Sequence, residues 1–444
     1  MKHKILLLYF SVALLYFNPM NAQEFTTGDH LLTLEDIWSK VELNNKELKA
    51  GQLNIDKGDE RLKAAKDDRL PMININGNYS QVSNMPVYEN GLFHTPRQNF
   101  VVHEHYQFGA ETALNLYNGG KTNLNIKIKS VENDLNTHQQ HLLGNTIKLK
   151  ATIYYFELFK NSQFKLLIEQ EITSNNSELK KITDLYKNGI VLKSDVLRAE
   201  VKISNQKMVL SEIENNIAIY TQQLNILMGN PDDSKIELDT QSIHLNDPFV
   251  LSSYEDYVAL ALKNSDEYKI SDVKEKLSLL NLKQVKSNIL PTISLFSNYN
   301  YTYPQGISYP YAIALYGYGQ VGLKMSVPIS NLYLNKHRRE EASIAYTQQK
   351  MGLEIKFDEI RQNVNAAYLH YTDALKRIET SQKNIIQSTE SLRILKNSYF
   401  NQQSLLTDLL DAETQLLQSK FDLTSAQVNA QVQYYQLLSK IGIL

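Results

Sequence analysis

The chain has 444 residues, and its composition excludes several classes of protein. It holds only 17 glycines and 10 prolines, so turns are scarce and we expect long helices and strands. The 46 Lys and Arg residues nearly balance 48 Asp and Glu, whereas nucleic-acid-binding proteins carry a basic surplus, so no nucleic-acid partner is expected. The absence of cysteine excludes disulfides, zinc–thiolate sites, cysteine nucleophiles and a lipid anchor on an N-terminal cysteine.

Residues 1–22 have the pattern of a secretory signal peptide. Lys2, His3 and Lys4 precede an apolar run from Ile5 to Phe17, and we expect cleavage after Ala22. A single anchoring helix is the less favoured alternative, because the run is shorter than the ~20 residues that span a bilayer. No later apolar stretch reaches that length, so the sequence excludes a helical membrane protein.

The mature chain is duplicated. Residues 35–79 match residues 255–299 at an offset of 220 without a gap, and further along the best offset is 213. Each copy is too long for a solenoid repeat. We therefore predict two structural repeats, at 23–229 and 254–444, joined by a linker at 230–253.

Each repeat begins with a helical pattern that stops before a proline, over 34–70 and over 254–290. An alternation of period two then predicts strands at about 72–82, 106–117, 292–303 and 318–329. One face of these strands is apolar. The side chains expected on the other, wet face are Asn74, Asn76, Asn78, Gln107, Glu111, Gln320 and Lys324.

The strands have the length and composition of membrane-spanning segments. Each supplies the ~9 to 11 residues that a tilted strand needs to cross a bilayer. The second hairpin is rich in tyrosine, as in the aromatic girdle of a membrane barrel, at Tyr299, Tyr301, Tyr303, Tyr309, Tyr311, Tyr316 and Tyr318. An ordinary β-sandwich face is the alternative. Four strands are too few to close a barrel, because even a barrel whose interior is filled by its own side chains needs about eight strands. Open strand edges are not tolerated in the hydrocarbon of a membrane. We therefore expect each repeat to donate a hairpin to a barrel shared between chains.

Long helical hairpins are predicted after the strands, at about 121–228 and 334–441. Their apolar residues recur in alternating steps of four and three, a 3.5-residue repeat typical of left-handed coiled coils. No proline interrupts residues 121–187, which at ~1.5 Å per residue make a rod about 100 Å long.

The strongest local motif follows each long helix. It consists of Tyr186, Asn188, Gly189, Asp195, Val196, Leu197 and Ala199 in the first repeat, and of Tyr399, Asn401, Asp408, Leu409, Leu410 and Ala412 in the second. With the duplicated element order and the Leu116–Gly120 segment, this motif resembles the TolC-like outer-membrane efflux protein family over essentially the whole mature chain. The resemblance implies a fold that is mainly α with β, and a homotrimer that shares a 12-stranded outer-membrane β-barrel continued by a periplasmic α-helical barrel.

The same resemblance implies a passive exit duct in a Gram-negative cell outer membrane, extending into the periplasm, for a tripartite efflux or type I secretion system. Its partners would be outer-membrane lipid, a periplasmic adaptor (membrane fusion) protein and an inner-membrane pump of the resistance-nodulation-division, ABC or similar class. No cofactor, metal or catalytic residue is expected. The alternative is a non-pore periplasmic or surface coiled-coil interaction protein, which would have no use for membrane-spanning alternation.

By resemblance, Asp408 and Asp411 match acidic positions that narrow the periplasmic entrance. Residues three apart share a helix face, so a trimer would gather six carboxylates and favour cations there. The candidate partners in this gate are Tyr399, Ser194 and Asp195, and the first-repeat counterpart of Asp411 is Arg198. An alternative for Asp408 stays open, because Ser194 and Thr407 resemble helix N-caps that precede a dipole-stabilising aspartate at the first helical position.

The turns after the long helices are the expected adaptor-docking tips, with a plain solvated turn as the alternative. The residues concerned are Asn188, Gly189, Ile190, Asn401 and Gln402.

The second repeat departs from the first and from the family at several positions. Gln402 replaces Gly189, Leu332 and Tyr333 replace Gly119 and Gly120, and Ser404 stands where the family tends to carry arginine. His94, His103 and His105, with Glu104, fall in the loop of the first hairpin and lack the spacing of a metal site.

Overall fold

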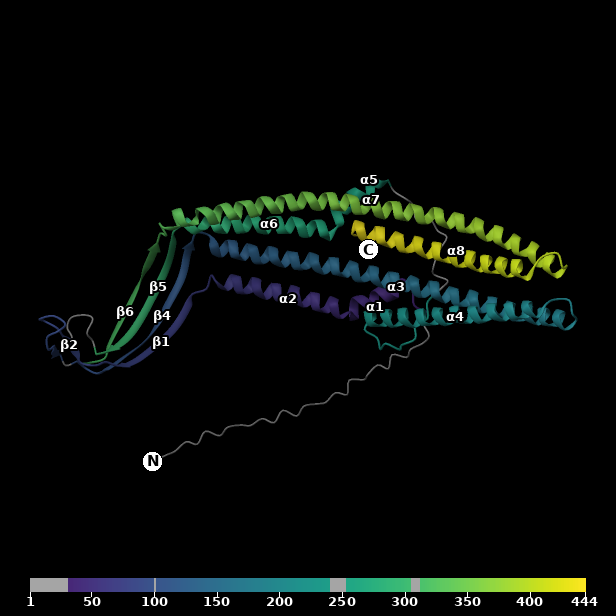
Figure 1. The fold of residues 1–444 in the computed structure, drawn as a ribbon. Helices are drawn as coiled ribbons and strands as arrows, with labels where there is room; N and C mark the ends of the chain where they lie inside the picture. Colours follow the sequence, from purple (N-terminus) through teal and green to yellow (C-terminus); the bar gives the residue numbers. More distant parts are fainter. Residues whose placement is uncertain (1–30, 100, 240–252, 305–311) are drawn as a thin grey trace, which may run out of the picture.

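The computed structural model describes residues 31–99, 101–239, 253–304 and 312–444. The chain is elongated, with its strands at one end and two helical hairpins reaching the other (Figure 1). The predicted signal peptide, most of the predicted linker, and Tyr309 and Tyr311 lie outside the described residues. No helix within the described ranges is both long and apolar enough to cross a membrane.

The first helix of each repeat is two helices, so the prediction of one continuous helix was wrong. The first repeat has α1 (Leu34–Asn44) and α2 (Lys46–Asp67), and the second has α5 (Tyr254–Asn264) and α6 (Asp266–Lys286). Asn45 breaks the first pair with an extended backbone (ψ 127°), and its side-chain oxygen accepts hydrogen bonds from the backbone N–H groups of Glu47 and Leu48. Asparagine is a preferred N-cap, and this capping competes with continuation of the helix.

The starts of α1 and α5 show the duplication in atomic detail. The Thr33 hydroxyl accepts a hydrogen bond from the N–H of Asp36, whose carboxylate accepts one from the N–H of Thr33. Ser253 and Asp256 form the same reciprocal pair in the second repeat. Such a capping box satisfies two backbone donors at a helix start, so both repeats begin their helical part by the same means.

The strands of the two repeats join in one antiparallel sheet of order β1-β4-β5-β6. Its strands are β1 (Met72–Gln81), β4 (Glu104–Asn118), β5 (Thr292–Tyr303) and β6 (Tyr316–Ser326). The central pair, β4 with β5, connects the repeats. A separate small ladder joins β2 (Met85–Val87) to β3 (Arg97–Asn99). The strand predicted to reach residue 329 ends at Ser326, shortly before Pro328, which has no N–H to donate to a ladder.

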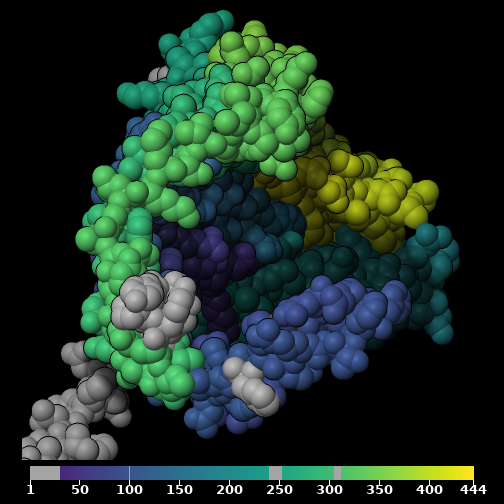
Figure 2. All heavy atoms as spheres, turned by 90° about the vertical axis from the view of Figure 1, so that its left-hand side faces the viewer, coloured from purple at the N-terminus to yellow at the C-terminus, as the bar shows by residue number. Residues whose placement is uncertain are grey.

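The register gives the sheet one polar and one apolar face. Asn74 lies opposite Glu111, Glu111 opposite Asn298, and Asn298 opposite Gln320, so a polar row crosses all four strands. The side-chain amides of Asn74 and Asn76 donate hydrogen bonds to the Glu111 carboxylate. Large apolar side chains on the other face are exposed, among them Ile73, Ile75, Val321, Leu323 and Met325. Seen from the strand end, the chain curves around a hollowed side (Figure 2).

Two helical hairpins form the rest of the chain. They are α3 (Lys121–Lys187) with α4 (Lys193–Met228), and α7 (Asn331–Phe400) with α8 (Leu406–Ile441). The second hairpin begins at Asn331, three residues before its predicted start at 334. Gly119 and Gly120 adopt positive φ angles of 69° and 77° before α3, whereas their counterparts Leu332 and Tyr333 lie inside α7, because side-chain-bearing residues favour the helix over this left-handed turn.

Three apolar clusters hold the helices together. The largest packs α1 and α2 against α3 and α4 through Ile37, Tyr155 and Leu224, with Val428 added from α8. A second surrounds Val364 and Leu437 in the second repeat. The third lies where the hairpins turn, and its buried members are Ile182, Ala199, Tyr399, Leu406 and Leu409. It contains residues of both hairpins, so their distal ends are packed on each other.

Asn45→Ala is expected to destabilise the protein by about 1–3 kcal/mol, because it removes a helix cap and a buried hydrogen bond. The amide group of Asn45 also donates to the carbonyl of Leu227 at the end of α4. The control is Ser265→Ala at the matching break, where the side chain makes no capping bond. Thermal unfolding of both variants in detergent measures the effect, and equal losses would contradict the assigned role of Asn45.

Candidate functional site

The two turns at the hairpin ends have the same backbone geometry. After α3, Gly189 donates to the carbonyl of Tyr186 over 2.9 Å, and after α7, Gln402 donates to the carbonyl of Tyr399 over 2.9 Å. Gly189 has a φ of 73°, and Gln402 has a φ of 63° as the only non-glycine residue with positive φ in the described part of the chain. The loss of glycine therefore does not change the turn, but it places a side chain in the left-handed region, where it is strained.

The predicted N-caps at these ends were wrong. α4 begins at Lys193 after Leu192, and α8 begins at Leu406 after Leu405, so Ser194 and Thr407 lie inside their helices. Leu406 is buried in the apolar cluster of the turns, and this burial favours a start of α8 two residues earlier than a Thr407 cap would give.

Asp195 and Asp408 consequently occupy the third helical position rather than the first. The Asp408 carboxylate accepts a hydrogen bond of 3.3 Å from the N–H of Leu405. A carboxylate in the first turn also offsets the helix dipole. The side chain of Asp408 thus has a local structural role, whatever its role in a gate.

The remaining gate candidates are distributed over the hairpin ends. Tyr399 is 7% exposed, and its hydroxyl has no hydrogen-bond partner among the described residues. Burial raises the pKa of Tyr399, and the charges of Asp195 and Glu178 raise it further. Arg198 and Asp411 are exposed and line a groove of about 780 Å³ between α4 and α8, without an ion pair between them in the described structure.

Four charged residues missed by the sequence analysis meet just behind these turns, one from each long helix. They are Glu178 of α3, Lys202 of α4, Lys396 of α7 and Glu413 of α8. Lys202 forms an ion pair with Glu413. Lys396 lies 2.8 Å from a Glu178 oxygen and 3.7 Å from a Glu413 oxygen. This four-helix charge cluster ties the two hairpins together.

Burial governs the electrostatics of the four-helix charge cluster. Desolvation raises the pKa of Glu413 to about 7, against the opposing pull of Lys202 and with the support of Glu178. Burial lowers the pKa of Lys396, but its hydrogen bond to Glu178 and the nearby carboxylate charges outweigh this and leave the pKa raised. One oxygen of Glu178 is buried and has no hydrogen-bond partner in the part of the chain that the structure describes. Replacing one member of such a group leaves its buried partner without a counter-charge. The protein then loses more stability than the intact ion pair contributes.

The pH dependence of stability should report on Glu413. Its carboxyl binds a proton more tightly in the folded protein (pKa about 7) than at its ordinary value of 4.5. The contribution of protonated Glu413 to the free energy of unfolding is therefore fully present below about pH 4.5, and it is lost as the pH rises through about 7. Thermal unfolding between pH 5 and 8 should show this decline in the wild type and not in Glu413→Gln. Parallel curves for the two proteins would contradict it.

Gln402→Gly is expected to stabilise the protein by about 1 kcal/mol, because it removes a left-handed non-glycine residue. The reciprocal control, Gly189→Gln, places the same side chain in the first-repeat turn and should destabilise by a similar amount. The measurement is the unfolding midpoint in urea for each variant. A destabilised Gln402→Gly protein would show instead that the glutamine side chain supports the turn.

Comparisons with known proteins agree with this architecture. The family model described as outer membrane efflux protein matches residues 37–230. Outer membrane protein TolC of Escherichia coli (strain K12) is 20% identical over 433 residues, covering 95% of this chain and 84% of TolC.

Solved structures show the same fold. The structure of CusC superposes with a TM-score of 0.78 at 16% identity, and the match covers 92% of each chain. CusC was solved to show the conformational changes that accompany its folding and transmembrane channel formation. The CmeC outer membrane channel of Campylobacter jejuni gives 0.77 at 13% identity, covering 92% of this chain and 85% of CmeC. The predicted fold class is thereby confirmed, and the relatives are outer-membrane channels rather than enzymes. Residues 37–230 thus match the outer membrane efflux protein family, and the fold of the chain is that of the solved outer-membrane channels.

Proposed function

We propose that the protein is the outer-membrane exit duct of a tripartite efflux or type I secretion system, and that it works as a homotrimer. The observation that carries the proposal is the register of the sheet, with a polar row on one face and exposed apolar side chains on the other. Such a sheet suits a wall with lipid on one side and water on the other.

The open edges of the sheet support oligomerisation, and the family resemblance implies that the oligomer is a trimer. Within the described residues, β1 and β6 each pair with one neighbour only, so each leaves an outer edge open. Unpaired backbone groups are not tolerated in lipid. Pairing β6 of one protomer with β1 of the next closes twelve strands into a ring, and the α3–α4 and α7–α8 hairpins then continue it into the periplasm.

The hairpin ends form the periplasmic entrance in this proposal. Asp408 and Asp411 supply the acidic ring, and Tyr399, Ser194, Asp195 and Arg198 lie on the neighbouring surfaces. The adaptor docks at the turns that contain Asn188, Gly189, Ile190, Asn401 and Gln402, and it connects the duct to an inner-membrane pump. Support comes from the matching geometry of the two turns, which presents equivalent docking surfaces from both repeats.

Planar-bilayer conductance and oligomeric mass, measured on one detergent-extracted sample, test the duct. We expect a trimer that gives discrete conductance steps with preference for cations. A water-soluble species without conductance would instead support the non-pore coiled-coil interaction protein.

Asp411→Ala is expected to reduce the cation preference of the channel, because it removes three of the six carboxylates at the entrance. The matched control is Asp422→Ala, which lies on the same face of α8 but about 16 Å farther from the turn. The measurement is the reversal potential in a salt gradient. Unchanged selectivity in Asp411→Ala would remove Asp411 from the gate.

A further inference from the structure

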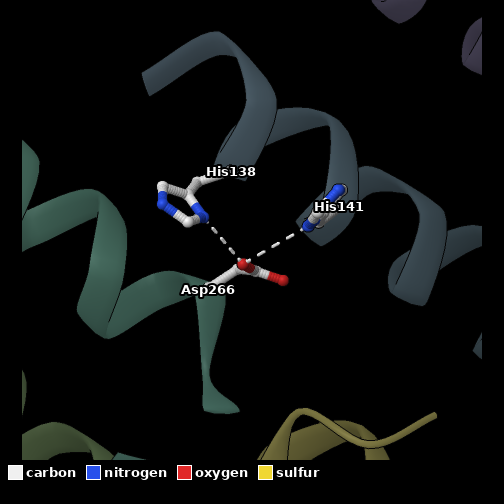
Figure 3. Close-up of side chains that lie close together, drawn as sticks. All are labelled: His138, His141 and Asp266. Atoms are coloured by element: carbon white, nitrogen blue, oxygen red, sulfur yellow. Dashed lines mark hydrogen bonds and ion pairs between the residues drawn. The ribbon is translucent and has the colours of Figure 1, made fainter. Parts of the chain in front are cut away.

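Two histidines of the first repeat and one aspartate of the second lie together partway along the helical rods. His138 and His141 are three residues apart on α3, so they share a helix face. Asp266 is the first residue of α6 and is only 7% exposed. Both imidazole rings point toward this carboxylate (Figure 3).

The three side chains are spaced for a shared ligand. Nδ1 of His138 lies 3.1 Å and Nδ1 of His141 3.9 Å from the same Asp266 oxygen, and all three potential ligand atoms lie within 4.8 Å of one another. In a tetrahedral zinc site with bonds of about 2.0–2.1 Å, ligand atoms are about 3.3 Å apart. Small changes in side-chain torsion angles on the fixed helices therefore bring the three atoms to coordination distance.

The surroundings leave room for entry and for a further ligand. The cluster opens into a hollow of about 630 Å³ that is lined by His141 and Asp266 and includes Asn145. The side chain of His141 is 61% exposed. An ion can reach the site from solvent without opening the helices, and water can occupy the fourth position of a site with three protein ligands.

The local charges permit a cation. Asp266 is the first residue of α6, so its carboxylate lies at the positive end of the helix dipole. Lys269 competes, since its Nζ lies 3.9 Å from the carboxylate, but its side chain is 38% exposed and its Nζ donates a hydrogen bond of 2.9 Å to the backbone carbonyl of Asn264. Lys148, which also lines the hollow, is paired with Glu42 over 2.5 Å. No fixed buried cation therefore opposes an ion among the described neighbours of the cluster.

We propose that His138, His141 and Asp266 bind one divalent transition-metal ion per chain and so link α3 to α6. Two imidazoles and one carboxylate favour Zn²⁺ and its first-row neighbours over Ca²⁺ or Mg²⁺, which prefer all-oxygen sites. The duplication does not repeat this site. The counterparts of the histidines are Met351 and Glu354, and the counterpart of Asp266 is Lys46.

Metal binding to the untagged mature protein, stripped with chelator and kept in detergent, tests the proposal. Co²⁺ serves as a coloured probe that Zn²⁺ should displace. We expect one Co²⁺ per chain, with an affinity reduced at least about 10- to 100-fold in His138→Gln and in His141→Gln. The matched control is His370→Gln, an exposed histidine of α7, which should bind like the wild type.

A second readout separates loss of binding from loss of folding. Zn²⁺ should raise the midpoint of thermal unfolding in the wild type and in His370→Gln, because a ligand that binds the folded state stabilises it. His141→Gln should unfold at the metal-free wild-type midpoint and show no rise. Absence of binding to the wild type, or equal binding by His141→Gln, would overturn the proposal. The contact between His138 and Asp266 would then be a structural hydrogen bond between α3 and α6. Neither measurement depends on conductance.

Discussion

The open edges of the four-stranded sheet are the constraint on which the rest of the structure depends. β1 and β6 each present a row of backbone groups without a strand partner in the described part of the chain, beside a face of exposed apolar side chains. Such a sheet is not a stable end state in water or in lipid. The duplication supplies the two hairpins that join through β4 and β5, and the proposed threefold assembly would close the two outer edges.

The duplication divides the chain into two similar halves that are joined by unlike contacts. The repeats meet along β4 and β5 and along α3 and α6, and they meet again behind the turns. Equivalent positions do not make equivalent interactions there: Glu413 is buried in an ion pair with Lys202, whereas its counterpart Glu200 is exposed. A trimer of such chains has threefold symmetry and only approximate sixfold symmetry.

The helices, the strands and the two faces of the sheet could be predicted from the sequence. The contacts between segments that are distant in the sequence could not. The period of two and the 3.5-residue repeat recur over many residues, so the strands and rods could be predicted. The breaks at Asn45 and Ser265 are single-residue events inside helix-forming sequence. They were missed although both residue types are common N-caps.

The four-helix charge cluster had no usable signal in the sequence. Its members lie next to the apolar seam of four different helices, and the duplication does not repeat the arrangement: Glu178 matches Ser391, and Lys202 matches Gln415. Only packing of the two hairpins reveals which charges are brought together. The same holds for His138 and Asp266, which are far apart in the sequence and in contact in the fold.

The unbroken course of α3 and α7 from the sheet to the distal turns makes each of them a lever. A stiff rod converts a small tilt at mid-length into a displacement that grows with distance from the pivot. The contact of α3 with α6 through His138 and Asp266 lies in the part of α3 nearer the sheet, while the turn lies at the other end of the helix. A partner that tilts α3 and α7 would therefore displace their distal ends more than any other part of them, without unfolding either helix.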